Sequence, residues 1–164
     1  MAWTITSGRL GLPALQTNHA TQGDTALGTI VQARDPDYGE GEFIYLKGVA
    51  STAVGSWVTY NTDDFTTTLL AANAIGPVAI AMSACVANEF GWYQISGKAL
   101  GKCLTAFADN ARVWITGTAG SVDDASVAGD GVNLAKGASL TAVGSGVADF
   151  EIHRPWVNDR TSFS

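Results

Sequence analysis

The sequence predicts an all-β domain, and three observations support this. Short runs rich in aromatic and β-branched residues recur at positions 41–50, 53–60, 76–84 and 91–99. Gly, Pro, Asn or Asp residues bound these runs, as is typical of strands joined by turns. The 19 glycines and four prolines also favour turns over long helices. We therefore expect a small β-barrel or β-sandwich with an extended N-terminal arm.

Alternation within the runs predicts which side chains share a face of a strand. Phe43 and Tyr45 should lie on one face, with Ile44 and Leu46 on the other. Segment 78–82 fits either a strand or a short helix, because its apolar residues are nearly continuous. The aromatic residues expected in the core are Phe43, Tyr45, Trp57, Tyr60, Trp92 and Trp114.

Further strands are expected outside the central stretch. Segment 26–33 is a candidate strand centred on Ile30 and Val31, and segment 66–70 starts another. Polar and apolar residues alternate over 92–96 and over 148–157, and the second of these segments is expected to form the final strand.

The first 40 residues differ from the rest of the chain. Leu10, Leu12 and Leu15 are scattered without a helical or strand period, and residues 34–41 are dense in turn formers. So long an irregular stretch is unusual inside a compact domain, whereas an arm that orders against a partner or a neighbouring subunit explains its apolar residues. The predicted organisation is an N-terminal arm (1–40), a β-barrel or β-sandwich body (41–157) and a polar C-terminal tail (158–164).

Composition argues against several classes of partner. Charged residues make up only 15% of the chain, and 15 acidic against 9 basic residues give a net charge of −6. This balance does not attract a phosphate backbone, so no direct binding of nucleic acid is expected. The chain has no signal-peptide pattern at its start and no apolar run of the ~20 residues that a membrane span needs. We expect synthesis in a host cytoplasm and no membrane partner.

The residues that might carry chemistry are few. His19 and His153 are the only histidines, and no Gly-x-Ser-x-Gly sequence marks a nucleophile. The carboxylate pairs Asp63–Asp64 and Asp123–Asp124 lie in turn-rich sequence, where turn formation explains them better than a glycosidase or calcium site. We predict no catalytic residue, no metal site and no cofactor, hence a protein that is not an enzyme.

Cys85 and Cys103 are the only cysteines. Two buried, small apolar side chains are the favoured interpretation. A disulfide is the alternative, and a cytosolic origin argues against it.

Four segments resemble the capsid decoration (cement) proteins of tailed bacteriophages and related small virion structural proteins. They are Gly-Glu-Phe-Ile-Tyr-Leu-Lys-Gly-Val at 41–49, Val-Gly-Ser-Trp-Val-Thr-Tyr at 54–60, Gly-Pro-Val-Ala-Ile-Ala-Met at 76–82 and Gly-Trp-Tyr-Gln-Ile-Ser-Gly at 91–97. The resemblance spans roughly residues 28–145. It implies a β-barrel or β-tulip-like body with an extended arm, bound outside an icosahedral shell where major capsid subunits meet. It implies no active site.

We accordingly expect a decoration protein that binds the outer capsid surface, bridges major capsid subunits and stabilises the shell. Its partners would be the major capsid protein and further copies of itself, with a trimer as the first expectation. The residues expected at capsid or subunit interfaces are Trp3, Ile5, Leu10, Leu12, Leu15, Ile30, Tyr38 and Trp156.

Two other functions compete with this expectation. Five tryptophans fit a glycan-binding or host-adhesion domain, which predicts exposed aromatic faces. A hydrolase would need His153 or the Asp63–Asp64 pair to converge with other groups in one pocket.

Overall fold

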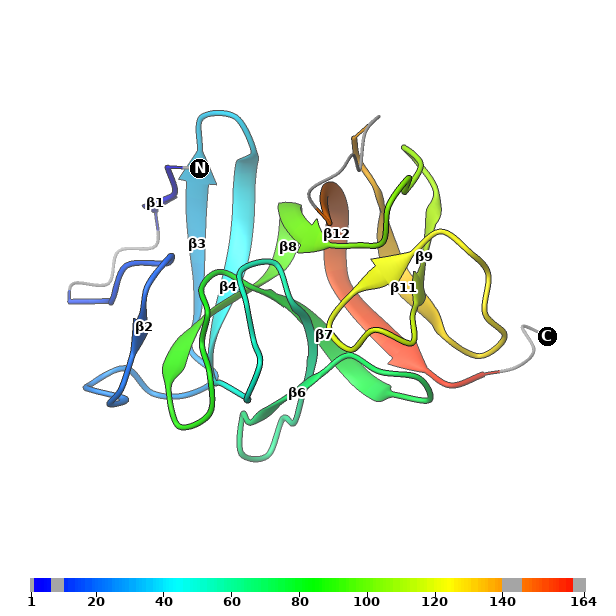
Figure 1. Cartoon of the computed structure of the whole chain (residues 1–164). Coiled ribbons are helices and arrows are strands. Elements are labelled where there is room, and N and C mark those ends of the chain that lie inside the picture. Colours follow the sequence, from blue (N-terminus) through cyan, green and yellow to red (C-terminus); the bar gives the residue numbers. More distant parts are fainter. Residues whose placement is uncertain (1, 7–10, 140–145, 161–164) are drawn as a thin grey trace.

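The computed structural model describes residues 2–6, 11–139 and 146–160. Over these residues the chain is all-β, which confirms the predicted fold class, and they contain no helix. Accordingly, no helix that could cross a membrane is found in the described part of the chain. Figure 1 shows the N-terminal strands at one end of the molecule and the ends of β9, β11 and β12 at the other.

The described residues form twelve strands. Two of them, β8 and β12, are much longer than the others. The strands are β1 (Thr4–Ile5), β2 (Asn18–His19), β3 (Ile30–Asp35), β4 (Gly39–Lys47), β5 (Trp57–Tyr60), β6 (Thr67–Leu69), β7 (Ile75–Ala81), β8 (Phe90–Lys102), β9 (Arg112–Ile115), β10 (Val122–Asp123), β11 (Gly131–Gly137) and β12 (Val147–Asn158).

All pairings between these strands are antiparallel. The main order is β1-β3-β4-β8-β7-β12-β11-β9-β10, while β2 pairs with β8, and β5 pairs with both β7 and β6. Two isolated parallel bridges, Lys47–Thr66 and Cys103–Val122, add contacts between distant segments. The sheet is not closed into a barrel, so a closed β-barrel is not the form that the body takes.

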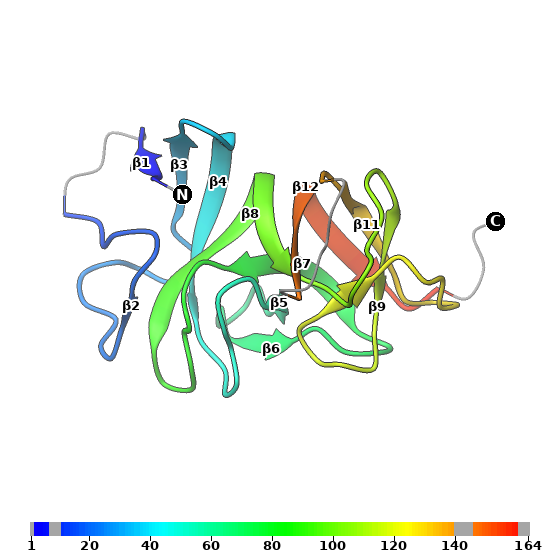
Figure 2. The same ribbon diagram turned by 45° about the horizontal axis from the view of Figure 1, so that its top comes forward.

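Strand β8 connects the two ends of the molecule (Figure 2). Its first half pairs with β4 and its second half pairs with β12. Gly97 lies where the partner changes, with a φ of +98° that side chains with a Cβ rarely adopt. A Cβ there would also lie 2.3 Å from the Glu40 carbonyl oxygen. Only glycine therefore lets β8 cross from one half to the other at this point.

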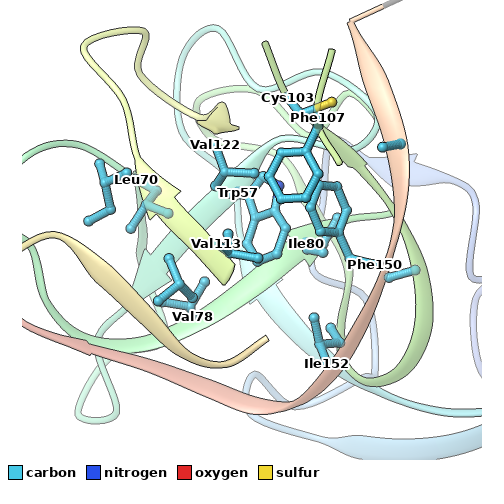
Figure 3. Packing of buried hydrophobic residues seen from close by; sticks show 14 of the residues in the cluster. Trp57, Leu70, Val78, Ile80, Cys103, Phe107, Val113, Val122, Phe150 and Ile152 are labelled. Atoms are coloured by element: carbon cyan, nitrogen blue, oxygen red, sulfur yellow. The ribbon is translucent and has the colours of Figure 1, made fainter. Parts of the chain in front are cut away.

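The largest core lies in the C-terminal half. Phe150 meets Trp57 edge-on, with ring centroids 5.0 Å apart, and Phe107 at 4.9 Å. Aliphatic residues from β7, β9 and β12 pack around these rings (Figure 3). We call this cluster the C-terminal core.

The two faces of β4 belong to two other cores. Ile44 and Leu46 pack with Val58 and Tyr93 from the neighbouring strands. Phe43 and Tyr45 point the other way and pack with Trp92, Leu15, Val31, Ala33 and Met82. The alternation predicted for this strand is confirmed, and we call the second cluster the N-terminal core.

The six aromatic residues that were expected in the core differ in how far they are buried. Four are fully buried and two are only partly buried. Tyr60 packs at the margin of the Ile44 cluster, and Trp114 has the Arg112 guanidinium 5.1 Å from its ring centroid. The buried four are Phe43, Tyr45, Trp57 and Trp92.

The bounds predicted for several segments can be compared with the strands that the structure shows. The 78–82 segment lies largely in β7 and is a strand, which settles the strand-or-helix alternative. The candidate strand at 26–33 begins only at Ile30, and the boundary placed at residue 40 falls inside β4, whose hairpin partner β3 lies on the arm side. Of the predicted tail, Asn158 ends β12 and residues 161–164 lie outside the described residues.

Both cysteines are free and buried, as the favoured interpretation held. Burial raises the pKa of the Cys85 thiol to about 11. Burial, together with the nearby Asp123 and Asp124 carboxylates, raises that of Cys103 to about 11 as well. Both thiols are therefore protonated at neutral pH, and the thiolate is the reactive form.

Candidate functional site

The N-terminal core is covered on one side by residues 11–29, which contain only the two-residue strand β2. Phe43, Tyr45 and Trp92 lie beneath this segment, and Leu15 is its one fully buried apolar anchor. Other apolar side chains pack against the same core but stay partly exposed to solvent. We call these five residues the N-terminal face: Trp3, Ile5, Leu12, Leu27 and Phe90.

Few polar contacts hold the covering segment in place. The Trp92 indole N–H donates to the Pro13 carbonyl (3.1 Å), and the Asn18 amide donates to the Glu89 carboxylate (2.6 Å). β2 adds two residue pairs with β8. At the end of the segment, the Gly28 N–H donates to the Tyr45 carbonyl (2.8 Å). The segment thus has much less backbone pairing than the strands it covers.

The first described residues lie across the same core by a separate route. Thr4 and Ile5 pair with β3, and Trp3 meets the Phe43 ring at 4.9 Å. The Trp3 indole nitrogen is buried and has no hydrogen-bond partner among the described residues. A buried unpaired donor is rare in native structures, so this indole marks an incompletely satisfied region.

Asp35 is a buried carboxylate beside these residues. It accepts hydrogen bonds from the backbone N–H groups of Ala2, Asp37 (2.8 Å) and Tyr38 (3.0 Å). Burial of the carboxylate raises its pKa, but the three donors outweigh this effect, so the pKa lies below its usual value. Asp35 thereby joins the start of the chain to the β3–β4 turn.

A second candidate surface is a groove of about 490 Å³ where β7 begins and β12 ends. Trp156 pairs with Pro77 across these strands, and Ile75 lies two pairs further along. The exposed fractions are 46% for Trp156 and 69% for Ile75, which is unusually high for such large apolar side chains. The remaining lining comes from Tyr60, Gly76 and a polar set of Thr59, Asn61, Thr62, Thr66 and Thr68.

Charged side chains on the outer face of β12 are paired. Asp149 accepts from the Tyr38 hydroxyl (2.7 Å) and forms an ion pair with Lys98 (3.2 Å). Glu151 pairs with Lys136 at 3.0 Å. Lys136 lowers the pKa of Glu151, because it donates a hydrogen bond to this carboxylate and attracts its negative charge. These contacts link β12 to neighbouring elements, which explains them as structural pairs.

The groups considered for catalysis do not meet in one pocket. Asp64 accepts hydrogen bonds from the backbone N–H and hydroxyl of Thr66 (3.0 and 2.8 Å), as turn formation predicts. These bonds lower the pKa of Asp64. Asp124 likewise accepts from the Ala108 N–H (2.9 Å), and exposed His153 lies 3.5 Å from Glu151. Among the described residues, no three potential metal ligands cluster.

The residues predicted for interfaces fall into different places. Trp3, Ile5, Leu12 and Leu15 are brought together at the N-terminal core, although Leu15 is buried there. Ile30 is the cross-strand partner of Ile44, which belongs to a different cluster from the N-terminal core, and Ile30 is 40% exposed. Leu10 lies outside the described residues. The last two are Tyr38, which lies 6.3 Å from the Trp3 ring and bonds Asp149, and Trp156, which lies in the groove.

Sequence reasoning missed Leu27 and Phe90 on the N-terminal face and Ile75 in the groove. Local pattern gave no signal for them, because their exposure depends on segments that pair from distant parts of the chain.

Comparisons with known protein families, curated proteins and solved structures found no match for this chain. Its fold, its surfaces and its chemistry therefore carry the functional argument.

Proposed function

We propose that this protein is a bacteriophage capsid decoration protein that acts from the exterior of the virion. It binds the outer capsid surface, bridges major capsid subunits and stabilises the shell, and it assembles as a homo-oligomer, with a trimer as the first expectation. The observation that carries the proposal is the N-terminal face. Five apolar residues there remain partly exposed around a core that a sparsely bonded segment covers.

The physical case rests on incomplete burial. Moving apolar surface out of water contributes about 25 cal/mol per Å², so a partner that covers the N-terminal face completes the burial of its side chains. Interface cores are enriched in aromatic residues and depleted in charge, and the N-terminal face has two aromatic and three aliphatic members. Many copies on one shell then stabilise it by mass action, without any strong single contact.

Charge also favours a protein partner. The net charge of −6 opposes association with a phosphate backbone. Asp149, Glu151 and Arg154 of β12 form ion pairs with residues of other strands. These features support binding to protein surfaces, with neither nucleic acid nor membrane as a direct partner.

The competing function is a glycan-binding or host-adhesion domain of a virion. One observation favours it, namely the exposed Trp156 in a hydroxyl-lined groove. The groove is lined by residues of β5–β7 and β12, whereas the N-terminal face is formed by other segments, so both functions fit on one chain.

The test uses expanded, undecorated capsids assembled from the major capsid protein of the same genome. We expect saturable co-sedimentation of the purified full chain with these capsids and a higher temperature of capsid disruption. Absence of both effects would refute the proposal.

A matched pair of variants locates the binding surface. Ala14 is exposed between Leu12 and Leu15, so Ala14→Arg places a charge beside the N-terminal face without removing core contacts. We expect this variant to lose capsid binding by at least tenfold, because burying an unpaired charge is costly. Ala125→Arg makes the same change on an exposed residue of the C-terminal half and should bind as the wild type does. Equal binding by both variants would exclude the N-terminal face.

A further inference from the structure

We propose that the groove lined by Tyr60 and Trp156 binds a neutral saccharide. This site is separate from the N-terminal face and does not depend on the proposed capsid function. It is formed where β7, β12 and the β5–β6 hairpin meet, so strands from three parts of the sequence position its residues.

The aromatic walls provide the first argument. Direct cross-strand partners lie on the same face of a sheet, so Trp156 and Pro77 stand side by side. Nearly half of the Trp156 surface is exposed, although a large apolar ring in water is unfavourable without an occupant. The negative face of an aromatic ring attracts the polarised C–H groups on the apolar side of a pyranose.

Unpaired hydroxyl groups provide the second argument. Thr59 and Thr68 form a cross-strand pair in this groove, and Thr62 lies in the turn between their strands. Within the described part of the chain, no side-chain hydrogen bond involves the hydroxyl of any of the three. A hydroxyl can donate and accept, which matches the hydroxyls of a sugar.

Charge selects the class of saccharide. The residues that line the groove carry no carboxylate, ammonium or guanidinium group. Arg154, whose charge acts on Tyr60, is held by the Glu42 carboxylate at 3.2 Å. Burial raises the pKa of Tyr60 although Arg154 opposes the shift, so its hydroxyl stays neutral near pH 7. The lining thus offers hydrogen bonds without a counter-charge for a sugar acid or a sugar phosphate.

Size and backbone shape agree with a small ligand. A groove of about 490 Å³ is within the range of roughly 300–1,000 Å³ that is usual for small-molecule sites. Gly76 lies in the groove with a φ of +137°, a conformation that strains any other residue. The nearest atom to a Cβ at this point would be the Tyr60 carbonyl oxygen, at 4.0 Å, so the glycine leaves open space there. The site fits a disaccharide or one end of a longer glycan.

The test follows the five tryptophan indole N–H signals of the full-length protein by two-dimensional NMR. The probes are four neutral sugars: lactose, cellobiose, N,N′-diacetylchitobiose and maltotriose. We expect saturable shifts of the Trp156 signal, assigned with Trp156→Phe, with at least one probe and little change of the buried Trp57 and Trp92 signals. No saturable shift of Trp156 with any of the four would overturn the proposal.

Variants separate a hydroxyl-lined sugar site from a simple apolar patch. Thr59→Val and Thr68→Val keep the side-chain shape, and each should weaken binding about three- to tenfold by removing a hydrogen bond. Thr17→Val changes an exposed threonine of the covering segment, outside the groove lining, and should leave the affinity unchanged. Unchanged affinity in both groove variants would contradict a saccharide site.

Two further outcomes distinguish other occupants. A proline-rich peptide that saturates the Trp156 shift while all four sugars fail would assign the groove to a protein ligand and refute the saccharide. The Ala14→Arg variant should retain sugar binding in full, because its substitution lies at the N-terminal face. The capsid proposal and the saccharide proposal can therefore fail independently.

Discussion

The N-terminal core and the C-terminal core are both built around aromatic pairs, but different kinds of structure cover them. Strands supply most of the residues around Trp57 and Phe150, and Leu70 and Phe107 are added from connecting segments. Beside Trp92, the strands lie on one side and an irregular segment lies on the other. The comparison teaches that a core built mainly from paired strands buries its large side chains, whereas a sparsely bonded segment leaves apolar surface available to a partner.

The largest expected effect comes from opening the C-terminal core. Phe150→Ala should lower the free energy of unfolding by about 3–5 kcal/mol, because a fully buried ring between Trp57 and Phe107 leaves a cavity. Urea denaturation measures this loss. Leu134→Ala, at a side chain that is 63% exposed, is the control and should change stability by less than about 0.5 kcal/mol. A loss below about 1 kcal/mol for Phe150→Ala would contradict the packing described.

A smaller and more local effect is expected in the N-terminal core. Leu15→Ala should cost about 2–3 kcal/mol, since Leu15 anchors the covering segment against Phe43 and Trp92. Hydrogen exchange should show that the backbone of residues 11–29 opens while β11 and β12 stay protected. Equal loss of protection in both regions would mean that the two cores do not respond separately.

Acid should weaken the N-terminal end through Asp35. Its pKa is lower in the folded than in the unfolded chain, so the unfolded state binds more protons and stability rises with pH in this range. The contribution is complete above the unfolded pKa of about 3.9 and is lost as pH falls through the lower folded value. Asp35→Asn should cost about 1–2 kcal/mol at pH 7 and flatten this acid dependence, measured by denaturation at several pH values. An unchanged acid slope would exclude Asp35 as the source.

The smallest effect concerns the contact between the two halves. Tyr38→Phe removes the hydrogen bond from the β3–β4 turn to Asp149 on β12 and should cost about 1 kcal/mol. Thr17→Val, at an exposed hydroxyl that bonds only within its own turn and to His19, should cost less. If Tyr38→Phe is neutral in thermal unfolding, this hydrogen bond does not couple the halves.

The sequence was informative where local period decides structure. Alternation placed Phe43 and Tyr45 opposite Ile44 and Leu46, because successive side chains of any strand point to opposite faces. Turn formers at 34–41 indicated a turn, but they did not show that β3 and β4 form a hairpin across it. That pairing assigns part of the expected arm to the sheet.

The candidate sites were harder to predict because they depend on pairing between distant segments. Trp156 is near the end of the chain and was assigned to an interface on that basis, yet its neighbours in the groove come from β5–β7. Trp3 and Trp92 are 89 positions apart in the sequence and belong to the same core. No local pattern encodes these contacts, which arise only when the sheet forms.

The central claim is that the N-terminal face becomes buried when the protein assembles on a capsid. Hydrogen exchange of the free and the capsid-bound protein tests it most directly. The account predicts new protection concentrated in residues 11–29 and around Phe90, with little change at Trp156 and the rest of the groove. Protection confined to β9–β12, or no difference between the free and the bound protein, would contradict it.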